Sequence, residues 1–316
     1  MIKHLPGGIA AIALSAAAIA QDTPAAPPSP AEIVAAAPKS HWQPIAAEDL
    51  LVMTLAPDAA GNPRQVVIQL MPAPFSQGWV HNIRLFARAK WYDGISVNRV
   101  QDNYVTQWGD PNYDNPEASG AVKPLPQGLK VMGEGEYVQR VPEAEEEQAG
   151  RFGLIDSYAE ATDIKFGFPV AQVGDHWWPV HCYGMVGVGR NYSPDTGSGA
   201  ELYTVIGHAP RQLDRNIALV GRVIEGIEHL TSLPRGKGEL GFYAEFEKDK
   251  RTPILSVRVA SDLPAEAQPR FEYLSTESES FAAYADARAN RRDAFFIHPV
   301  GGADICNVPV PVRRAE

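Results

Sequence analysis

The sequence predicts a mainly β protein: a closed or nearly closed antiparallel β-barrel with two capping helices, followed by a C-terminal strap of helical and extended chain. Three observations support this prediction. The chain has many short β-type runs separated by turn residues, it has only two modest helix patterns, and it has no internal repeat. Such a pattern is typical of β-barrels. About 45% of the 316 residues are apolar, which is enough for a large core.

The N-terminal twenty residues have the layout of a secretory signal. Lys3 precedes an apolar run, and Ala18-Ile19-Ala20 before Gln21 forms a small-x-small cleavage site. The apolar run is short for a transmembrane helix, although an uncleaved membrane anchor is the alternative. We therefore expect a signal peptide over 1–20, a periplasmic protein, and no integral membrane segment after cleavage. The formal net charge of −10 and the absence of a basic stripe argue against nucleic acid as a partner.

The first half of the chain reads as a linker followed by barrel elements. Residues 21–44 are rich in Pro and Ala, which favours a linker. The β-type runs at 49–56 and 64–71 flank the turn-rich PDAAGNP and predict a hairpin. Apolar residues between 79 and 91 recur at helical spacing. The following stretch, SVNRVQDNYVTQWGDP at 96–111, predicts a strand, a loop and a strand.

The second half contains an insertion and further strands. Residues 111 to about 175 are rich in Pro, Gly and acid, and the charge run PEAEEEQ at 142–148 favours a solvated short helix or loop. Strands are predicted within 181–189, 200–207 and 252–260. The segment 218–236 begins as a strand and becomes a helix from Glu225, with Ile227, Leu230 and Leu233 on one face.

The C-terminal extension, 263–316, combines a helix signal with extended runs. Thr276 with Glu279 three residues later is a capping-box signal for a helix. The runs 294–300 and 307–312 favour a strand or an extended tail. A separate unit is one interpretation of this extension. We favour a strap packed on the barrel, because its aromatic residues need burial: Phe281, Tyr284, Phe295 and Phe296.

The two cysteines leave two interpretations open. In an oxidising compartment Cys182 and Cys306 can form one disulfide, and otherwise they are two separate small apolar residues. His176, His181 and Cys182 match no strong metal template, so we expect no metal site. The glycine-rich run 187–199 lacks the lysine of a phosphate-binding loop, and we expect no cofactor. We expect this run, which includes Gly189, to form the rim of a pocket.

Five segments, in order, resemble those of cyclophilin-type peptidyl-prolyl cis-trans isomerases. The central one carries Arg99, Tyr104, Gln107 and Gly109-Asp110 at the family's spacing. The others are HNIRLFARAKWYDG at 81–94, GMVGVGR at 184–190, GAELYTVIG at 199–207 and QLDRNIALVGRVIEGIEHL at 212–230. The resemblance implies a cyclophilin-like barrel domain over 45–262, with an insertion at about 111–175. The chain departs from the family pattern at several positions: Val105, Trp108, Glu201, Gln212 and Ile217.

Isomerisation of an X-Pro bond breaks no covalent bond, so it needs no nucleophile or metal. The reaction needs a pocket that binds the proline ring and a hydrogen-bond donor for the nitrogen of the twisted amide. An arginine supplies rigid, permanently charged N–H donors, and aromatic side chains can line the pocket for the ring. Taken alone, Arg99 would be a surface or ion-pair residue. The resemblance implies that three residues are catalytic: Arg99, Gln107 and Tyr104. It implies that six others bind the substrate: Val105, Gly189, Glu201, Tyr203, Gln212 and Leu213.

The predicted activity is therefore isomerisation of proline-containing polypeptides, which assists the folding of exported proteins. The alternative is a weakly active or inactive binding module of the same fold, a chaperone for proline-containing segments. The changes at Glu201 and Gln212 motivate this alternative. A tryptophan at the position of Gln212 helps cyclosporin binding in the family, so weak cyclosporin binding is expected. Asp110 and Asp214 are expected to be structural.

Overall fold

The computed structural model describes residues 26–113, 118–140, 152, 154 and 156–315. The expected signal peptide at 1–20 and the acidic run at 142–148 lie outside the described residues. Across the described ranges, no helix combines the length and the apolar character that a membrane crossing requires.

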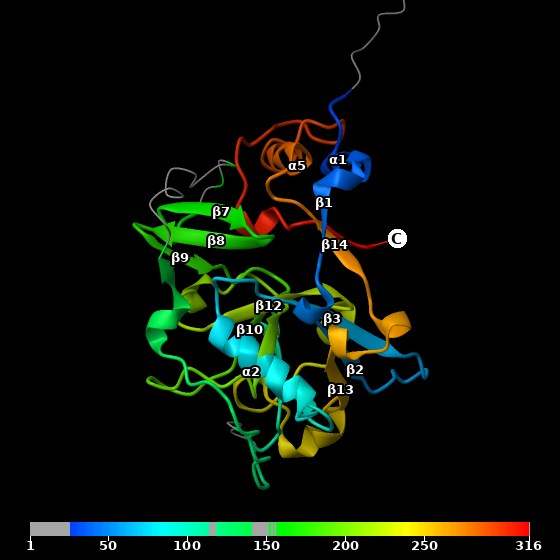
Figure 1. The fold of residues 1–316 in the computed structure, drawn as a ribbon, viewed down its shortest axis with the longest axis vertical. Helices are drawn as coiled ribbons and strands as arrows, with labels where there is room; N and C mark the ends of the chain where they lie inside the picture. Colours follow the sequence, from blue (N-terminus) through cyan, green and yellow to red (C-terminus); the bar gives the residue numbers. More distant parts are fainter. Residues whose placement is uncertain (1–25, 114–117, 141–151, 153, 155, 316) are drawn as a thin grey trace, which may run out of the picture.

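The central unit is an eight-stranded antiparallel barrel (Figure 1). Its strands neighbour one another in the order β13-β2-β3-β12-β10-β11-β5-β4. Backbone bonds close the ring between its two ends, because Val97 N donates to Thr252 O at 2.9 Å and Ile254 N donates to Ile95 O at 2.8 Å. The predicted barrel is confirmed. The strand bounds are β2 Leu50–Leu55, β3 Arg64–Leu70, β4 Ser96–Val100, β5 Val105–Gly109, β10 Met185–Val188, β11 Leu202–Val205, β12 Leu219–Glu225 and β13 Ile254–Val259.

The first predicted helix is α2, Gln77–Arg88, which lies across the barrel (Figure 1). It buries the side chains of Trp79, Val80, Ile83 and Phe86 completely, as the helical spacing of its apolar residues predicts. This apolar face joins the main core cluster, which fills the barrel interior. Two of the loops around α2 contain cis proline bonds, at Ala73-Pro74 and Ser193-Pro194.

The second predicted helix is much shorter than expected. Strand β12 continues to Glu225, and the helix α4 covers only Glu228–Thr231. Gly226 between them has a φ of +82°, and a side chain there would overlap the backbone carbonyl of Gln65. The helix therefore cannot begin at Glu225, because this turn must first redirect the chain. Leu230 and Leu233 are nevertheless buried.

Four strands between residues 139 and 179 form a second antiparallel sheet in the order β6-β9-β8-β7. It lies at one end of the barrel (Figure 1). The composition of residues 111–175 gives no indication of this sheet. Trp177 and Trp178 are buried in it. The strand bounds are β6 Gln139–Arg140, β7 Ala161–Lys165, β8 Phe168–Val173 and β9 His176–Pro179.

The expectation that residues 21–44 form a linker without regular structure is wrong for 30–44. The helix α1 covers Pro30–Ala36, and the strand β1 covers Trp42–Pro44. Ser29 and Glu32 form a reciprocal capping box, and Pro30 occupies the first helical turn, so the sequence does carry a helix start signal. α1 packs against the C-terminal helix α5, Glu279–Ala289, and β1 pairs with β14, Phe271–Leu274.

The C-terminal extension contributes to the main core. It contains β14 Phe271–Leu274, α5 Glu279–Ala289 and β15 Val312–Arg314. The helix is capped by Ser278, whose hydroxyl accepts from the N–H of Phe281, and not by Thr276. Phe281 and Tyr284 are buried in the main cluster. Phe295 is 85% exposed and Phe296 is 38% exposed, so the expected burial of this pair is wrong.

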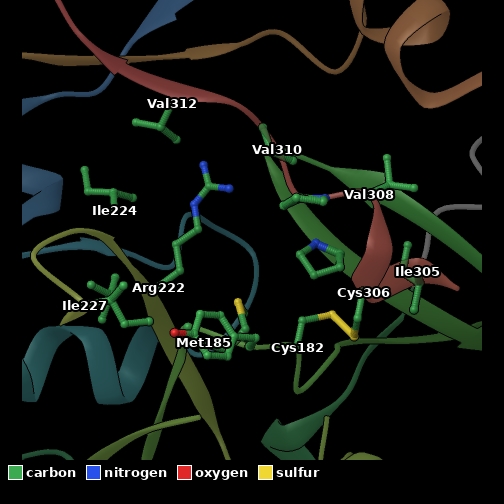
Figure 2. Close-up of a pocket in the computed structure, with 15 residues that line it drawn as sticks. Cys182, Met185, Arg222, Ile224, Ile227, Ile305, Cys306, Val308, Val310 and Val312 are labelled. Atoms are coloured by element: carbon green, nitrogen blue, oxygen red, sulfur yellow. A yellow bond between two sulfur atoms is a disulfide. The ribbon is translucent and has the colours of Figure 1, made fainter. Parts of the chain in front are cut away.

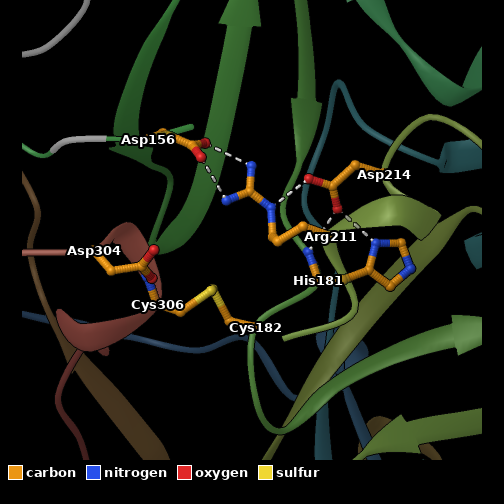
Figure 3. Close-up of a disulfide and its surroundings, with 7 residues drawn as sticks. All are labelled: Asp156, His181, Cys182, Arg211, Asp214, Asp304 and Cys306. Carbon is orange, nitrogen blue, oxygen red and sulfur yellow. Dashed lines mark hydrogen bonds and ion pairs between the residues drawn. A yellow bond between two sulfur atoms is a disulfide. The ribbon is translucent and has the colours of Figure 1, made fainter. Parts of the chain in front are cut away.

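Cys182 and Cys306 form a disulfide, which resolves the two interpretations of these residues. The bond joins the segment before β10 to the 3₁₀ turn at Ile305–Asn307 (Figure 3). It therefore ties the C-terminal extension to the barrel across a sequence separation of 124 residues.

Candidate active site

Strand register places Arg99, Gln107 and Tyr203 in one row across three neighbouring strands. Arg99 on β4 is opposite Gln107 on β5, and Gln107 is opposite Tyr203 on β11. A register irregularity between Val97 and Arg99 precedes the row. Asn98 within it is buried and donates from Nδ2 to the carbonyl of Gly109 at 3.0 Å. This irregularity sets the position of Arg99 opposite Gln107.

The alternation of side chains along these strands separates the pocket from the barrel interior. Trp108 and Leu202 belong to the main core. Val105, Tyr203 and Val205 belong instead to a small separate cluster. Because successive side chains of a strand point to opposite faces, the row and this cluster share the outer face. Tyr104, Leu213 and Ile217 pack on the same cluster.

Most of the expected site residues line one pocket of about 830 Å³. The set comprises Arg99, Tyr104, Val105, Gln107, Gly189, Tyr203 and Leu213. Glu201 and Gln212 are not among its lining residues. Glu201 is buried, and Gln212 is exposed in the 3₁₀ turn Arg211–Leu213. The run 187–199, expected at the pocket rim, also contributes Arg190, Asn191 and Tyr192. The sequence did not indicate the remaining lining residues as substrate-binding: Asn112, Ala118, Ile217, Leu240 and Phe242.

The Arg99 guanidinium is held by neutral acceptors. Nε donates to the carbonyl of Leu240 at 2.7 Å, Nη1 donates to Oε1 of Gln107 at 3.1 Å, and Nη2 donates to Oε1 of Gln101. No carboxylate among the described residues forms an ion pair with Arg99. Burial lowers the pKa of the guanidinium below its ordinary value. Arg99 is thus a fixed cation whose charge is not cancelled by a neighbouring acid.

Two aromatic rings flank this cation. The rings of Tyr104 and Phe242 each have their centroid 5.5 Å from the guanidinium carbon. Leu240, which supplies the carbonyl, has a φ of +53°, a left-handed conformation that is uncommon for leucine. Phe242 and Leu240 come from the loop between α4 and β13, about 140 residues after Arg99. The only sequence signal for them is an aromatic residue beside a glycine in a polar loop.

Glu201 lies beneath the site. Gln107 Nε2 donates to Glu201 Oε2 at 3.3 Å, which fixes the orientation of the Gln107 amide toward Arg99. A side chain at Gly109 would overlap the Glu201 carboxylate, so glycine is needed here for close approach. Glu201 therefore positions Gln107 and does not itself line the pocket.

A buried polar chain holds the hydroxyl of Tyr203 (Figure 3 shows all its members except Tyr203). His181 Nε2 lies 2.9 Å from the Tyr203 hydroxyl, and His181 Nδ1 lies 2.8 Å from Oδ1 of Asp214. Arg211 donates from Nε to Asp214 at 2.6 Å and pairs through both terminal nitrogens with Asp156. The sequence gives no indication that His181 contacts a residue of the pocket. Among the described residues no cluster able to hold a metal ion is present.

The expected structural roles of the two aspartates agree with these contacts. Asp110 is buried and accepts from the backbone N–H groups of Asn112 and Lys123, so it caps a turn. Asp214 accepts from the backbone and the ring of His181. His181 and Arg211 lower the pKa of Asp214 from 3.8, although burial acts in the opposite direction and is the largest single influence.

We predict that Asp214→Asn is less stable than wild type at neutral pH, and that the difference shrinks in acid. A lowered carboxylate pKa stabilises the folded state above the unfolded value of 3.8, and this contribution is lost as pH falls through the folded pKa. Urea unfolding of both proteins from pH 7 to pH 2 measures the difference in free energy of unfolding. A difference that grows below pH 3.8 would contradict the prediction.

The sequence of the chain matches a known protein family. Residues 60–259 match the family model described as cyclophilin type peptidyl-prolyl cis-trans isomerase/CLD. The chain belongs to this family. A solved cyclophilin, AquaCyp293 from Hirschia baltica, has a similar fold, with a TM-score of 0.60 and 20% identity over 86% of this chain and 93% of that chain.

A second solved structure, a cyclophilin type peptidyl-prolyl cis-trans isomerase from Cryptosporidium parvum, is more distant. Its TM-score is 0.39, with 12% identity over 66% of this chain and 96% of that chain. No curated protein matches this cyclophilin. The family match covers the barrel from the β2–β3 turn to the end of β13, including the four-stranded sheet. The cyclophilin family acts on proline-containing substrates.

Proposed function

We propose that this cyclophilin isomerises X-Pro bonds in exported polypeptides, with Arg99 as the catalytic residue. The observation that carries the proposal is the Arg99 guanidinium, which has no acidic partner among the described residues, beside a small apolar cluster in the same pocket. The X-Pro bond has partial double-bond character and a barrier of ~18–20 kcal/mol, so uncatalysed isomerisation is slow. An enzyme lowers this barrier by binding the twisted amide better than either planar form.

Arg99 has N–H groups left to bind the twisted amide of the substrate. A guanidinium carries five N–H groups, and within the described part of the chain three of them are used, by Leu240, Gln107 and Gln101. Two N–H groups on the terminal nitrogens remain for the substrate. In the twisted amide the prolyl nitrogen regains its lone pair, and a charged N–H donor stabilises it. The three protein contacts hold the guanidinium in place before the substrate binds, so little reorganisation is needed.

The proline ring would bind on the small apolar cluster beside Arg99. Val105 and Tyr203 form its floor, and Tyr104, Leu213 and Ile217 form its sides. Burial raises the pKa of Tyr104 and raises that of Tyr203 further, so both hydroxyls stay protonated and the walls stay neutral at physiological pH. A neutral aromatic surface suits the proline ring.

The proposed location is an exported, oxidising compartment, and a bacterial periplasm is the preferred one. The Cys182–Cys306 disulfide supports this, because disulfides persist mainly in oxidising compartments. The signal-like layout of residues 1–20 points the same way. Clients would be exported polypeptides whose folding is limited by proline isomerisation.

An isomerase assay on an Ala-Pro peptide tests the proposal. Wild-type protein should accelerate exchange between the cis and trans forms, seen as NMR exchange broadening or as a faster phase in a protease-coupled assay. The proposal also predicts faster refolding of a model protein whose slow phase is proline-limited. An exchange rate no higher than that of buffer would contradict catalysis.

A binding module is the second candidate function. It is favoured by the buried Glu201 carboxylate, which bonds to Gln107 and places negative charge close to the site. Such a protein would hold proline-containing segments with little turnover. Peptide binding by wild type and by Arg99→Ala, without exchange broadening in either, would support the binding module over the isomerase.

We predict weak binding of cyclosporin, and tighter binding after Gln212→Trp. Gln212 is exposed and lies outside the pocket lining, so wild type offers no indole at this edge. A tryptophan would add a large flat apolar surface with a hydrogen-bond donor. Isothermal titration of both proteins measures the two affinities. Tight cyclosporin binding by wild type, or no gain in affinity in Gln212→Trp, would contradict the alignment of Gln212 with the family's tryptophan.

A further inference from the structure

A second cavity, of about 300 Å³, lies between the barrel and the C-terminal extension (Figure 2). The barrel side comes from β10, β12 and the segments beside them, Pro169 of β8 adds to the lining, and the other side comes from residues 305–312. The Cys182–Cys306 disulfide borders the cavity. Apart from Arg222 and Tyr183, all the lining side chains are apolar or belong to the disulfide. They are Pro169, Cys182, Gly184, Met185, Val223, Ile224, Ile227, Ile305, Cys306, Val308, Pro309, Val310 and Val312.

Arg222 is the unusual member of this lining. It is only 9% exposed, and Figure 2 shows its guanidinium reaching from β12 across the cavity toward the segment that carries Val310 and Val312. Its Nε donates to Oε1 of Gln69 at 2.9 Å, and its guanidinium carbon lies 4.8 Å from the centroid of the Phe168 ring. Nη2 is buried and has no hydrogen-bond partner among the described residues.

No acid balances this charge within the described part of the chain. Glu225 on β12 is paired with Arg314, and Glu272 on β14 is paired with Arg313. Burial lowers the pKa of Arg222 to about 10, so the group is still a cation at neutral pH. A buried cation without an anionic partner is costly to the folded state, and an anion in the cavity would remove that cost.

We propose that this cavity binds an aliphatic monocarboxylate, with the carboxylate on Arg222 and the hydrocarbon tail among the valines and isoleucines. A guanidinium fork matches a carboxylate in a bidentate arrangement. At about 30 Å³ for each water-sized group, the cavity holds about ten such groups, which is the size of octanoate. A peptide C-terminus is a poorer occupant, because its amide groups would need polar partners that these apolar side chains do not offer.

Octanoate binding to the full-length protein tests the proposal. Isothermal titration and the octanoate-induced rise in Tm should both show binding to wild type. Arg222→Met keeps much of the side-chain volume and removes the charge, so it should bind octanoate about 10- to 100-fold more weakly. The matched control is Arg292→Met, an arginine on the surface whose side chain is 52% exposed. It should bind octanoate as wild type does.

A second variant keeps the test decisive if Arg222→Met does not fold. Val310→Trp fills the cavity and leaves Arg222 in place, so it should also abolish octanoate binding. Octan-1-ol, which has the same tail without the carboxylate, should bind far more weakly than octanoate. The proposal is overturned if wild type does not bind octanoate, or if both cavity variants bind it as tightly as wild type does.

Peptide titrations test the alternative occupant of the cavity, a peptide C-terminus. A short peptide with a free, apolar C-terminus and its amidated form are titrated into wild type. If the free peptide binds and octanoate does not, the cavity is a site for peptide C-termini and our proposal is wrong. None of these outcomes depends on isomerase activity, because Arg99→Ala should leave octanoate binding unchanged.

Discussion

Replacing Arg99 by alanine is expected to lower kcat/KM for X-Pro isomerisation by about 100- to 1,000-fold. Removal of one preorganised donor that acts in the transition state typically costs about 2.7–4 kcal/mol. Here the donors belong to a cation that is partly withdrawn from solvent and has no acidic partner among the described residues. The loss should fall mainly on kcat, because the proline ring still finds Tyr104, Val105 and Tyr203.

Arg99→Lys should rescue little of this activity. Three neutral acceptors from Leu240, Gln107 and Gln101 fit the planar fork of a guanidinium. A lysine ammonium is a point charge with three donors, so it cannot satisfy these acceptors and also bind the substrate at two positions. Rates close to wild type in Arg99→Lys would show that only the charge matters.

The measurement is the rate of cis–trans exchange of an Ala-Pro peptide at several enzyme concentrations. Arg140→Ala is the matched control, because this arginine is exposed on β6 and, among the described residues, its side chain forms a single ion pair, with Asp175 at 3.7 Å. It should keep wild-type activity. Circular dichroism and Tm report whether Arg99→Ala is folded. A folded Arg99→Ala protein with wild-type kcat/KM would assign catalysis to another group.

The barrel could be predicted from sequence because each of its strands carries its own local signal. The hairpin of β2 and β3, for example, consists of two β-type runs around a turn rich in Pro and Gly. The sheet of β6 to β9 was not predicted, because β8 and β9 contain prolines and residues 111–175 are rich in Pro, Gly and acid. α4 was predicted too long because Leu230 and Leu233 have helical spacing, but their burial comes from a single turn and the loop after it.

The local part of the site could also be predicted. Arg99, Tyr104 and Gln107 lie on one hairpin, so their spacing in sequence nearly fixes their spacing in space. Leu240 is 141 residues from Arg99, and its contact is made by a backbone carbonyl in a left-handed conformation. No side-chain pattern encodes such a contact. The role of His181 depends on a tyrosine hydroxyl at position 203 and on Asp214, which come together only when the barrel closes.

Loss of the Cys182–Cys306 disulfide is expected to lower the free energy of unfolding by about 2–4 kcal/mol. The two cysteines are 124 residues apart, so the bond removes a large amount of chain entropy from the unfolded state. It also joins the C-terminal extension, which supplies buried Phe281 and Ile305 to the core, to the segment before β10. Cys182→Ala/Cys306→Ala should therefore unfold at lower urea concentration than wild type.

The matched control for this effect is wild type in reductant under mildly destabilising conditions. Reductant should lower the unfolding midpoint of wild type to that of the double variant, and it should leave the double variant unchanged. Isomerase activity at low temperature should survive in both, since Arg99, Gln107 and Tyr203 are positioned by strand pairing within the barrel. Activity could instead be lost together with the disulfide while the barrel stays folded. That result would show that strand pairing alone does not hold the site, and that catalysis also needs the disulfide to position His181, the neighbour of Cys182, against the Tyr203 hydroxyl.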